Sequence, residues 1–470
     1  MRSSLARSIA VAVACAAGLS ASLTVTPAVA SAPAASEKGA VTRFGYKASV
    51  YGTKLLVNNV EVRTLRDADL QLPCTRIAGV RKAQPSLATL PIENDLIKVA
   101  ATSSESKTYR DAAKGINGVR AISTVADIEL GGEVAGVATP VLTIEGLRSV
   151  ADSFYDAQAN NGAGAFRETH SFGFQGMKLT MPENSPVPAE VQQLLDILSQ
   201  VTAPVTQIVN QVVQLLTELA APLEIPGLGS ISLGTSSGKT GPNFAAAEAY
   251  ALRILVDATG EDTVLQLGRA SSRISRPVPA GVFRSTMSAL ELTALNDIVS
   301  LGGIAQRSIP CEGTFGKVRT ISTPTASLVH EQLGVSLKGM KYTYQGLQKG
   351  AVGRGFSSAQ VDEVRVAVPN SLDILIKGLS SRVDVYAPGK GQEVRKKVST
   401  TFAQILVNGV DITDSLRPGP GYTFDNGVVQ MLVQQDRNYY GTKVSGLVIQ
   451  LTALDTAINL GQVSARFLTK

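Results

Sequence analysis

Short runs of apolar residues alternate with polar residues along most of the chain. Residues 54–62 read Lys-Leu-Leu-Val-Asn-Asn-Val-Glu-Val, and similar runs recur up to the C-terminus, separated by Gly, Pro, Asn and Asp. This alternation is typical of half-buried strands, and the frequent turn residues are typical of antiparallel sheets with short connections. The pattern therefore predicts a mainly β protein with antiparallel β-sandwich-like domains.

Segments of the first half recur in the second half in the same order. Leu72-Pro73-Cys74 matches Ile309-Pro310-Cys311, and the further matches are 125–130 with 361–366, 144–149 with 376–381 and 267–271 with 460–464. The separation is nearly constant for the first three pairs and shorter for the last, so the first half contains an insertion. We predict two tandem copies of one β domain, at 42–275 and 281–470, joined across residues 276–279.

The insertion, at about 187–222, has the apolar spacing of an amphipathic helix. Its apolar residues follow one another by three and four positions, which places them on one face. Pro204 interrupts this pattern and is expected to divide it into two helices. The face packs on its own domain or between the two copies, or it docks a protein partner or a second copy of the chain. Residues 188–221 contain no Lys or Arg, which argues against a lipid surface. The candidate docking residues are Val191, Leu194, Leu198, Val201, Val205, Ile208, Val212, Leu215 and Leu219.

The N-terminus has the features of a secretory signal. Arg2 and Arg7 precede a run of small and apolar residues at 9–23, and Ala28-Val29-Ala30 offers a cleavage site. We expect residues 1–30 to be removed, residues 31–41 to form a disordered lead-in, and the mature chain to have no transmembrane segment. The protein is therefore expected to be secreted, either extracellular or associated with the cell envelope.

Composition excludes several functions. The chain has 44 Lys and Arg against 38 Asp and Glu, and no run of Lys and Arg is long enough to suggest nucleic-acid binding. Two histidines and three cysteines leave few ligands for a metal, and no cofactor is expected. Tryptophan is absent, which weakens carbohydrate binding, although Tyr439 and Tyr440 could stack on sugars.

Removal of the signal leaves two cysteines, Cys74 and Cys311, at equivalent positions of the two copies. An even pair in an oxidising compartment suggests a disulfide. A bridge requires the two Cα atoms to come within about 7 Å of each other. The alternative is two buried thiols that pack as small apolar groups.

Candidate catalytic motifs are weak. Residues 234–238 satisfy the G-x-S-x-G pattern around Ser236, but that motif needs a strand before it, a helix after it and a later His. His330 lies in the other copy, and His170 is expected at the surface. Ser104 and Lys107 have the spacing of a Ser-x-x-Lys motif, in what we expect to be a polar loop. We therefore do not expect an enzyme; the alternative is a secreted hydrolase that acts on an envelope or extracellular polymer.

Several segments resemble a known family. Tyr51-Gly52-Thr53, residues 225–233 and residues 252–256, followed by 267–271, look like the actinobacterial secreted proteins called choice-of-anchor P. The second copy resembles them at 406–409 and 426–429. The resemblance implies an extracellular, β-rich protein without an established activity. The expected function is thus a secreted, non-enzymatic binding or structural protein with an unknown ligand.

Overall fold

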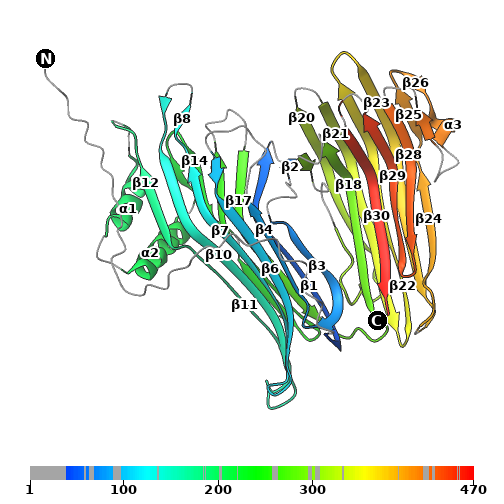
Figure 1. Ribbon diagram of the computed structural model, residues 1–470, viewed down its shortest axis with the longest axis horizontal. Helices are drawn as coiled ribbons and strands as arrows, with labels where there is room; N and C mark the ends of the chain where they lie inside the picture. The colour runs from blue at the N-terminus through cyan, green and yellow to red at the C-terminus, as the bar shows by residue number, and fades with distance from the viewer. Residues whose placement is uncertain are drawn as a thin grey trace.

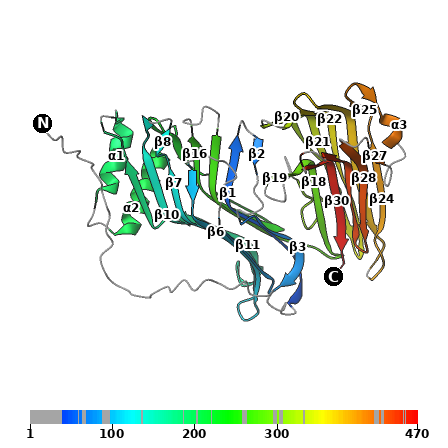
Figure 2. The same cartoon turned by 45° about the horizontal axis from the view of Figure 1, so that its top comes forward.

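The computed structural model shows a mainly β protein with several antiparallel sheets, as predicted. Two β-sandwiches lie side by side, with two helices at the end of the first sandwich that is remote from the second (Figure 1, Figure 2). The predicted signal peptide lies outside the described residues. The structure describes residues 39–57, 60–62, 68–87, 97–134, 137–183, 185, 187–200, 204–219, 221–234, 236–256, 263–294, 299–301, 307–330, 333–389, 391–416, 423–425, 429–451, 454 and 456–469.

The first sandwich is formed by strands from residues 40–275. Its first sheet contains β13 (Leu223–Ile225), β14 (Gly229–Leu233), β16 (Phe244–Val256), β17 (Thr263–Ser275), β1 (Ala40–Val57) and β2 (Val60–Val62) in spatial order, with β15 (Ser237–Gly241) on β16 and β3 (Leu70–Ala78) on β1. Its facing sheet contains β11 (Ala165–Gly173), β10 (Val141–Asp156), β7 (Ile116–Leu130), β6 (Ala101–Asp111) and β4 (Arg81–Leu87), with β12 (Gly176–Thr180) on β10 and β5 (Ile97–Val99) on β7. A separate hairpin consists of β8 (Glu133–Val134) and β9 (Val137–Ala138). Strand β1 begins at Ala40, so the expected end of the disordered lead-in at residue 41 is wrong.

The second sandwich is formed by strands from residues 282–468. Its first sheet contains β27 (Thr423–Asp425), β28 (Val429–Asn438), β29 (Gly441–Leu451), β30 (Thr456–Leu468), β18 (Val282–Ala294) and β19 (Val299–Leu301) in spatial order. Its facing sheet contains β20 (Arg319–His330), β21 (Leu333–Lys349), β22 (Val352–Val368), β23 (Leu372–Ala387), β25 (Gln404–Val407) and β26 (Val410–Asp411), with β24 (Arg395–Thr401) on β23. One helical turn, α3 (Thr413–Leu416), follows β26.

The two sandwiches share one strand order. The path β13-β14-β16-β17-β1-β2 of the first corresponds to β27-β28-β29-β30-β18-β19 of the second. The register agrees as well, because Val125 pairs with Leu147 across β7 and β10, and Val361 pairs with Leu379 across β22 and β23. Segments that match in sequence therefore occupy equivalent places in the fold.

The recurring Leu-Gly motif marks a close approach between the two sheets of each sandwich. Gly268 and Gly461 adopt positive φ values of 63° and 56°, which favour glycine. A Cβ atom at Gly268 would lie 3.1 Å from Ser149 Oγ, and one at Gly461 would lie 3.1 Å from Ser381 Oγ. The repeated motifs thus maintain sheet packing in both sandwiches.

The insertion forms two helices, α1 (Ala189–Leu198) and α2 (Val205–Glu218). Pro204 is the N-cap residue of α2, so the predicted division at this proline is confirmed. Both helices pack on the first sandwich, where their apolar residues join those of β7, β10 and β16 in one core cluster. The second sandwich has its own core, which includes Phe283 and Phe467 with ring centroids 4.7 Å apart.

Candidate functional site

The apolar face of the helical insertion is not a free surface. Five of its residues are at most 5% exposed and belong to the core of the first sandwich, namely Val191, Leu194, Leu198, Ile208 and Val212. Leu215 and Leu219 are partly buried against the same core. Val201 and the side chain of Val205 lie outside the described residues. Of the alternatives above, the structure shows packing of this face on its own sandwich, and the docking alternative is wrong for the five buried residues because the sandwich already covers them.

Two of the candidate catalytic residues, Ser236 and His170, have structural partners. Ser236 Oγ accepts a hydrogen bond from the backbone N–H of Tyr250 at 3.2 Å, which ties it to β16. His170 Nδ1 lies 2.9 Å from Glu168 Oε2 on β11, a strand at the end of its sheet path. Ser104 is on strand β6 and is 1% exposed, so its placement in a polar loop was wrong. The second sandwich's His330 is the last residue of β20.

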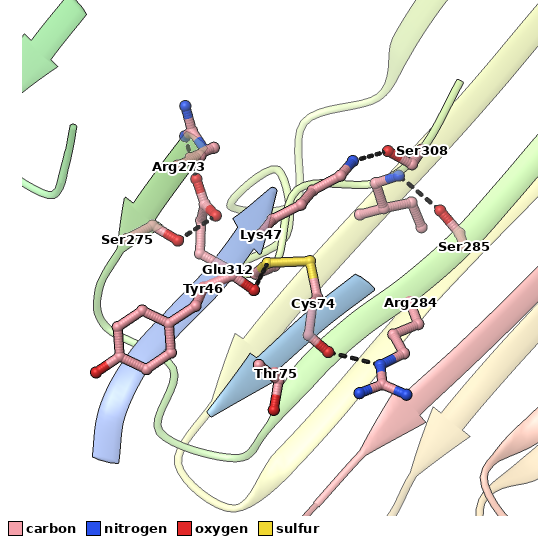
Figure 3. Close-up of a disulfide and its surroundings, with 12 residues drawn as sticks. Tyr46, Lys47, Cys74, Thr75, Arg273, Ser275, Arg284, Ser285, Ser308 and Glu312 are labelled. Atoms are coloured by element: carbon pink, nitrogen blue, oxygen red, sulfur yellow. Dashed lines mark hydrogen bonds and ion pairs between the residues drawn. A yellow bond between two sulfur atoms is a disulfide. The ribbon is translucent and has the colours of Figure 1, made fainter. Parts of the chain in front are cut away.

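Cys74 and Cys311 form a disulfide that links the two sandwiches. Their Cα atoms are 5.4 Å apart, within the distance that a bridge requires. Cys74 lies on β3, and Cys311 lies in the segment before β20, where its carbonyl oxygen accepts a hydrogen bond from the backbone N–H of Phe283. Both cysteines are buried, together with Val278 of the linker. The structure therefore contains the bridge and not two buried thiols (Figure 3).

Charged groups surround this disulfide (Figure 3). Glu312, which is 6% exposed, reaches from the second sandwich to β17, where it pairs with Arg273 and accepts a hydrogen bond from Ser275 Oγ at 2.7 Å. Arg284 of β18 also reaches from the second sandwich to the first, and its Nε donates to the carbonyl oxygen of Cys74 at 2.6 Å. A buried carboxylate is tolerated only when it is paired and hydrogen-bonded, so these bonds fix the junction in one arrangement.

Lys47 adds a titratable group to the junction. Its Nζ donates to Ser308 Oγ of the second sandwich. Burial lowers the pKa of Lys47 to about 8, the positive charge of Arg273 acts in the same direction, and the negative charge of Glu312 opposes them. We therefore expect the junction to respond to mildly alkaline pH.

A second feature is an open, positively charged sheet surface, which we name the basic face. It lies on the outer side of β21–β24, since the alternate residues Val383 and Val385 of β23 point into the core. The strand register places its side chains in adjacent rows: Phe356 pairs with Gln345 and Asp384, and Tyr386 pairs with Arg354. The basic face consists of Gln345, Arg354, Phe356, Arg382, Asp384, Tyr386, Arg395 and Lys397, which with Gly355, Val385 and Lys396 line a hollow of about 580 Å³.

The charge of the basic face is only partly neutralised. Its one carboxylate, Asp384, is held by Arg382 through two hydrogen bonds of 2.9 and 2.7 Å, and the Arg382 guanidinium lies 3.8 Å from the centroid of the Phe356 ring. Within the described part of the chain, Arg354, Arg395 and Lys397 form no ion pair. All three are exposed, and Tyr386 beside them is 39% exposed.

The equivalent surface of the first sandwich is closed. Arg120 and Asp152 of β7 and β10 occupy the places of Phe356 and Asp384, as the shared register shows. Asp152 is 3% exposed, because Arg120 pairs with it at 2.6 Å and the Tyr109 hydroxyl donates to it at 2.8 Å. Burial and the adjacent Asp152 carboxylate raise the pKa of the Tyr109 hydroxyl. At this position the first sandwich therefore buries its carboxylate, whereas the Asp384 side chain of the second sandwich is 39% exposed.

Sequence reasoning did not find the basic face. Its residues come from four strands, and apart from the short Arg395-Lys396-Lys397 stretch its basic residues are scattered along the chain. The sequence signal is the set of polar and aromatic residues at alternate positions of β23 (382, 384 and 386) and of β24 (395 and 397). These residues can be recognised as one surface only when the pairing register of the two strands is known.

Comparison of the chain with models of known protein families, with curated proteins and with solved structures finds no match. Among the described residues, no group of three or more His, Cys, Asp or Glu side chains could hold a metal ion. No helix within the described ranges is long and apolar enough to cross a membrane.

Proposed function

We propose that the protein is a secreted, non-enzymatic binding protein of the cell envelope or the extracellular space, and that its basic face holds an acidic glycan. We further propose that it belongs with the choice-of-anchor P proteins that it resembles. The observation that carries the binding proposal is the open hollow of the second sandwich, where five cationic side chains and one carboxylate line the surface.

The chemistry of the basic face suits a sulfated or carboxylated sugar chain. Guanidinium groups bind carboxylate and sulfate oxygens with paired hydrogen bonds, and an exposed aromatic ring offers a flat apolar surface to a sugar. Arg354 and Arg395 flank the Tyr386 ring, as their pairing in the sheet requires. The β-sheet surface is extended, so several units of a polymer could contact it in succession.

A second exposed tyrosine borders the basic face. Tyr439 is 46% exposed, and its hydroxyl donates to the carbonyl oxygen of Gly391 at 2.9 Å. Its own carbonyl oxygen accepts a hydrogen bond from the backbone N–H of Val394, which precedes β24. Tyr440 packs edge-on against it with ring centroids 5.0 Å apart, which holds the ring of Tyr439 in place. The suggestion that these tyrosines stack on sugars is therefore part of the proposal.

The test is the affinity of the mature, oxidised chain for heparin, polygalacturonate and uncharged dextran, measured by isothermal titration calorimetry. We expect one or both acidic polymers to bind with an affinity that falls as salt is added, because exposed charges are screened. Dextran is expected not to bind. The triple variant R354Q/R395Q/K397Q should weaken binding at least tenfold while the thermal unfolding midpoint stays unchanged.

The matched control removes the same charge from the first sandwich. Lys178, Lys239 and Arg253 are exposed, and the variant K178Q/K239Q/R253Q lowers the net charge by the same amount. If the proposal is correct, this control binds as the unmodified protein does. Equal weakening in both variants, or no binding of either acidic polymer, would show that the basic face is not a glycan site.

A further inference from the structure

A second hollow lies on the first sandwich beside the linker, and we name it the arginine hollow. It has a volume of about 530 Å³, within the range of small-molecule sites. Its lining residues come from β1, β3, the turn before β16 and the linker between the sandwiches. They are Arg43, Arg76, Asn243, Arg276, Pro277, Val278 and Pro279, so three arginines and no carboxylate residue line this space.

The three arginines have no carboxylate partner among the described residues. Within the residues that the structure describes, neither Arg43, Arg76 nor Arg276 forms an ion pair. Burial lowers the pKa of Arg76, which means that its surroundings do not compensate its charge. Like charges that share a partly desolvated hollow repel one another, and a bound anion would remove this repulsion.

Arg76 and Arg276 are held in place by groups that do not neutralise them. Arg76 Nε donates to the carbonyl oxygen of Thr42 at 3.0 Å, and Thr42 Oγ1 donates back to the carbonyl oxygen of Arg76 at 3.0 Å. Arg276 stacks on two rings, with its guanidinium carbon 4.3 Å from the centroid of Tyr155 and 5.4 Å from that of Phe166. Side chains fixed in this way lose little entropy when a ligand binds.

The positive region continues beyond the arginine hollow. Arg43 also lines an adjoining hollow of about 430 Å³, whose other lining residues include Arg110 and Tyr155. The one carboxylate there, Asp111, lies 3.8 Å from the Lys114 ammonium group. The adjoining hollow therefore does not offset the charge of the three arginines.

We propose that the arginine hollow binds a small organic dianion, a phosphate ester or a dicarboxylate, through the guanidinium groups of Arg43, Arg76 and Arg276. Guanidinium groups match the paired oxygens of both ligand types. The hollow exceeds the size of a single ion, so the ligand carries an organic body, and the apolar rings of Pro277 and Pro279 offer it a surface. This site is separate from the basic face and does not depend on glycan binding.

The test is calorimetric titration of the oxidised, full-length mature chain with glucose 1-phosphate, succinate and uncharged glucose at low ionic strength. We expect saturable binding of one molecule per chain for the phosphate ester, the dicarboxylate or both, and none for glucose. The comparison of glucose 1-phosphate with succinate identifies the anionic group that the site prefers. Binding of glucose with equal affinity, or no saturable binding of either anion, would overturn the proposal.

Variants locate the site. R276Q and R43Q should each weaken anion binding at least tenfold, whereas R253Q, which removes an exposed arginine elsewhere on the same sandwich, should have no effect. R43Q is included because Arg43 is exposed, so its loss leaves the fold intact even if R276Q perturbs the linker. The basic-face variant R354Q/R395Q/K397Q should bind the anion normally. Unchanged affinity in R43Q and R276Q, or equal loss in R253Q, would contradict the assignment.

Discussion

Cleavage of the Cys74–Cys311 disulfide should destabilise the two sandwiches by different amounts. The bond spans a sequence separation of 237 residues. If the first sandwich unfolds while the second stays folded, the bond closes a loop from Cys74 to Val282 of roughly 210 residues, which by chain entropy contributes about 5 kcal/mol. If the second sandwich unfolds alone, the loop runs from Ser275 to Cys311, roughly 36 residues, and contributes about 4 kcal/mol.

Hydrogen exchange measured by mass spectrometry in increasing urea can separate the stabilisation of the first sandwich from that of the second. Peptides from β7 and β10 follow the first sandwich, and peptides from β22 and β23 follow the second, since these strands contain the most protected core residues. We expect the free energy of opening to fall upon reduction by up to about 5 kcal/mol in the first set and about 4 kcal/mol in the second.

Two controls isolate the bond itself. The first control is the reduced, unmodified protein, which loses the disulfide but keeps both buried sulfur atoms. The second is the variant C74A/C311A, which loses the disulfide and the packing of the sulfur atoms. The variant should therefore be at least as unstable as the reduced protein. Under native, non-reducing conditions the mature chain should show no reactive thiol after denaturation. Two reactive thiols per chain, or equal free energies of opening before and after reduction, would refute the reasoning.

Three further predictions concern packing and pH. Burial lowers the pKa of Lys47 from 10.5 to about 8, so the unfolded chain binds more protons than the folded chain between these two pH values. The free energy of unfolding should therefore rise with pH across this window by on the order of 3 kcal/mol. In urea denaturation, K47M should abolish this rise. Burial raises the pKa of Tyr46 from 10.0 to about 12, so stability should fall above pH 10, and Y46F should reduce that fall. G461A should cost roughly 1 to 3 kcal/mol in urea denaturation, because Gly461 has a positive φ and Ser381 lies opposite; an unchanged midpoint would contradict the packing argument.

The sequence predicted the features that depend on local patterns. Apolar alternation indicated the strands, and the matched segments, predicted to be equivalent, occupy equivalent places in the two sandwiches. Pro204 divided the insertion because a proline cannot continue a helix, which is a local effect. These predictions succeeded because each depends on neighbouring residues or on a repeat that is visible along the chain.

Features that depend on which surfaces meet were not predictable. The periodicity of Val191, Leu194 and Leu198 is the same whether the helix covers its own sandwich or a partner. Ser104 lies in a polar segment, yet the facing sheet buries its side chain. The sequence could not distinguish a disulfide from two free thiols, because a bridge depends on the distance between the two Cα atoms across the junction.

The central claim is that the basic face binds an acidic glycan, and lysine footprinting tests it directly. The mature, oxidised chain is acetylated briefly with and without saturating heparin or polygalacturonate, and each lysine is quantified by mass spectrometry. Lys397 lies on the basic face, whereas Lys178 and Lys239 are exposed on the first sandwich. We predict that the bound polymer protects Lys397 and leaves Lys178 and Lys239 unprotected. Equal protection of all three lysines, or none at Lys397, would contradict the account.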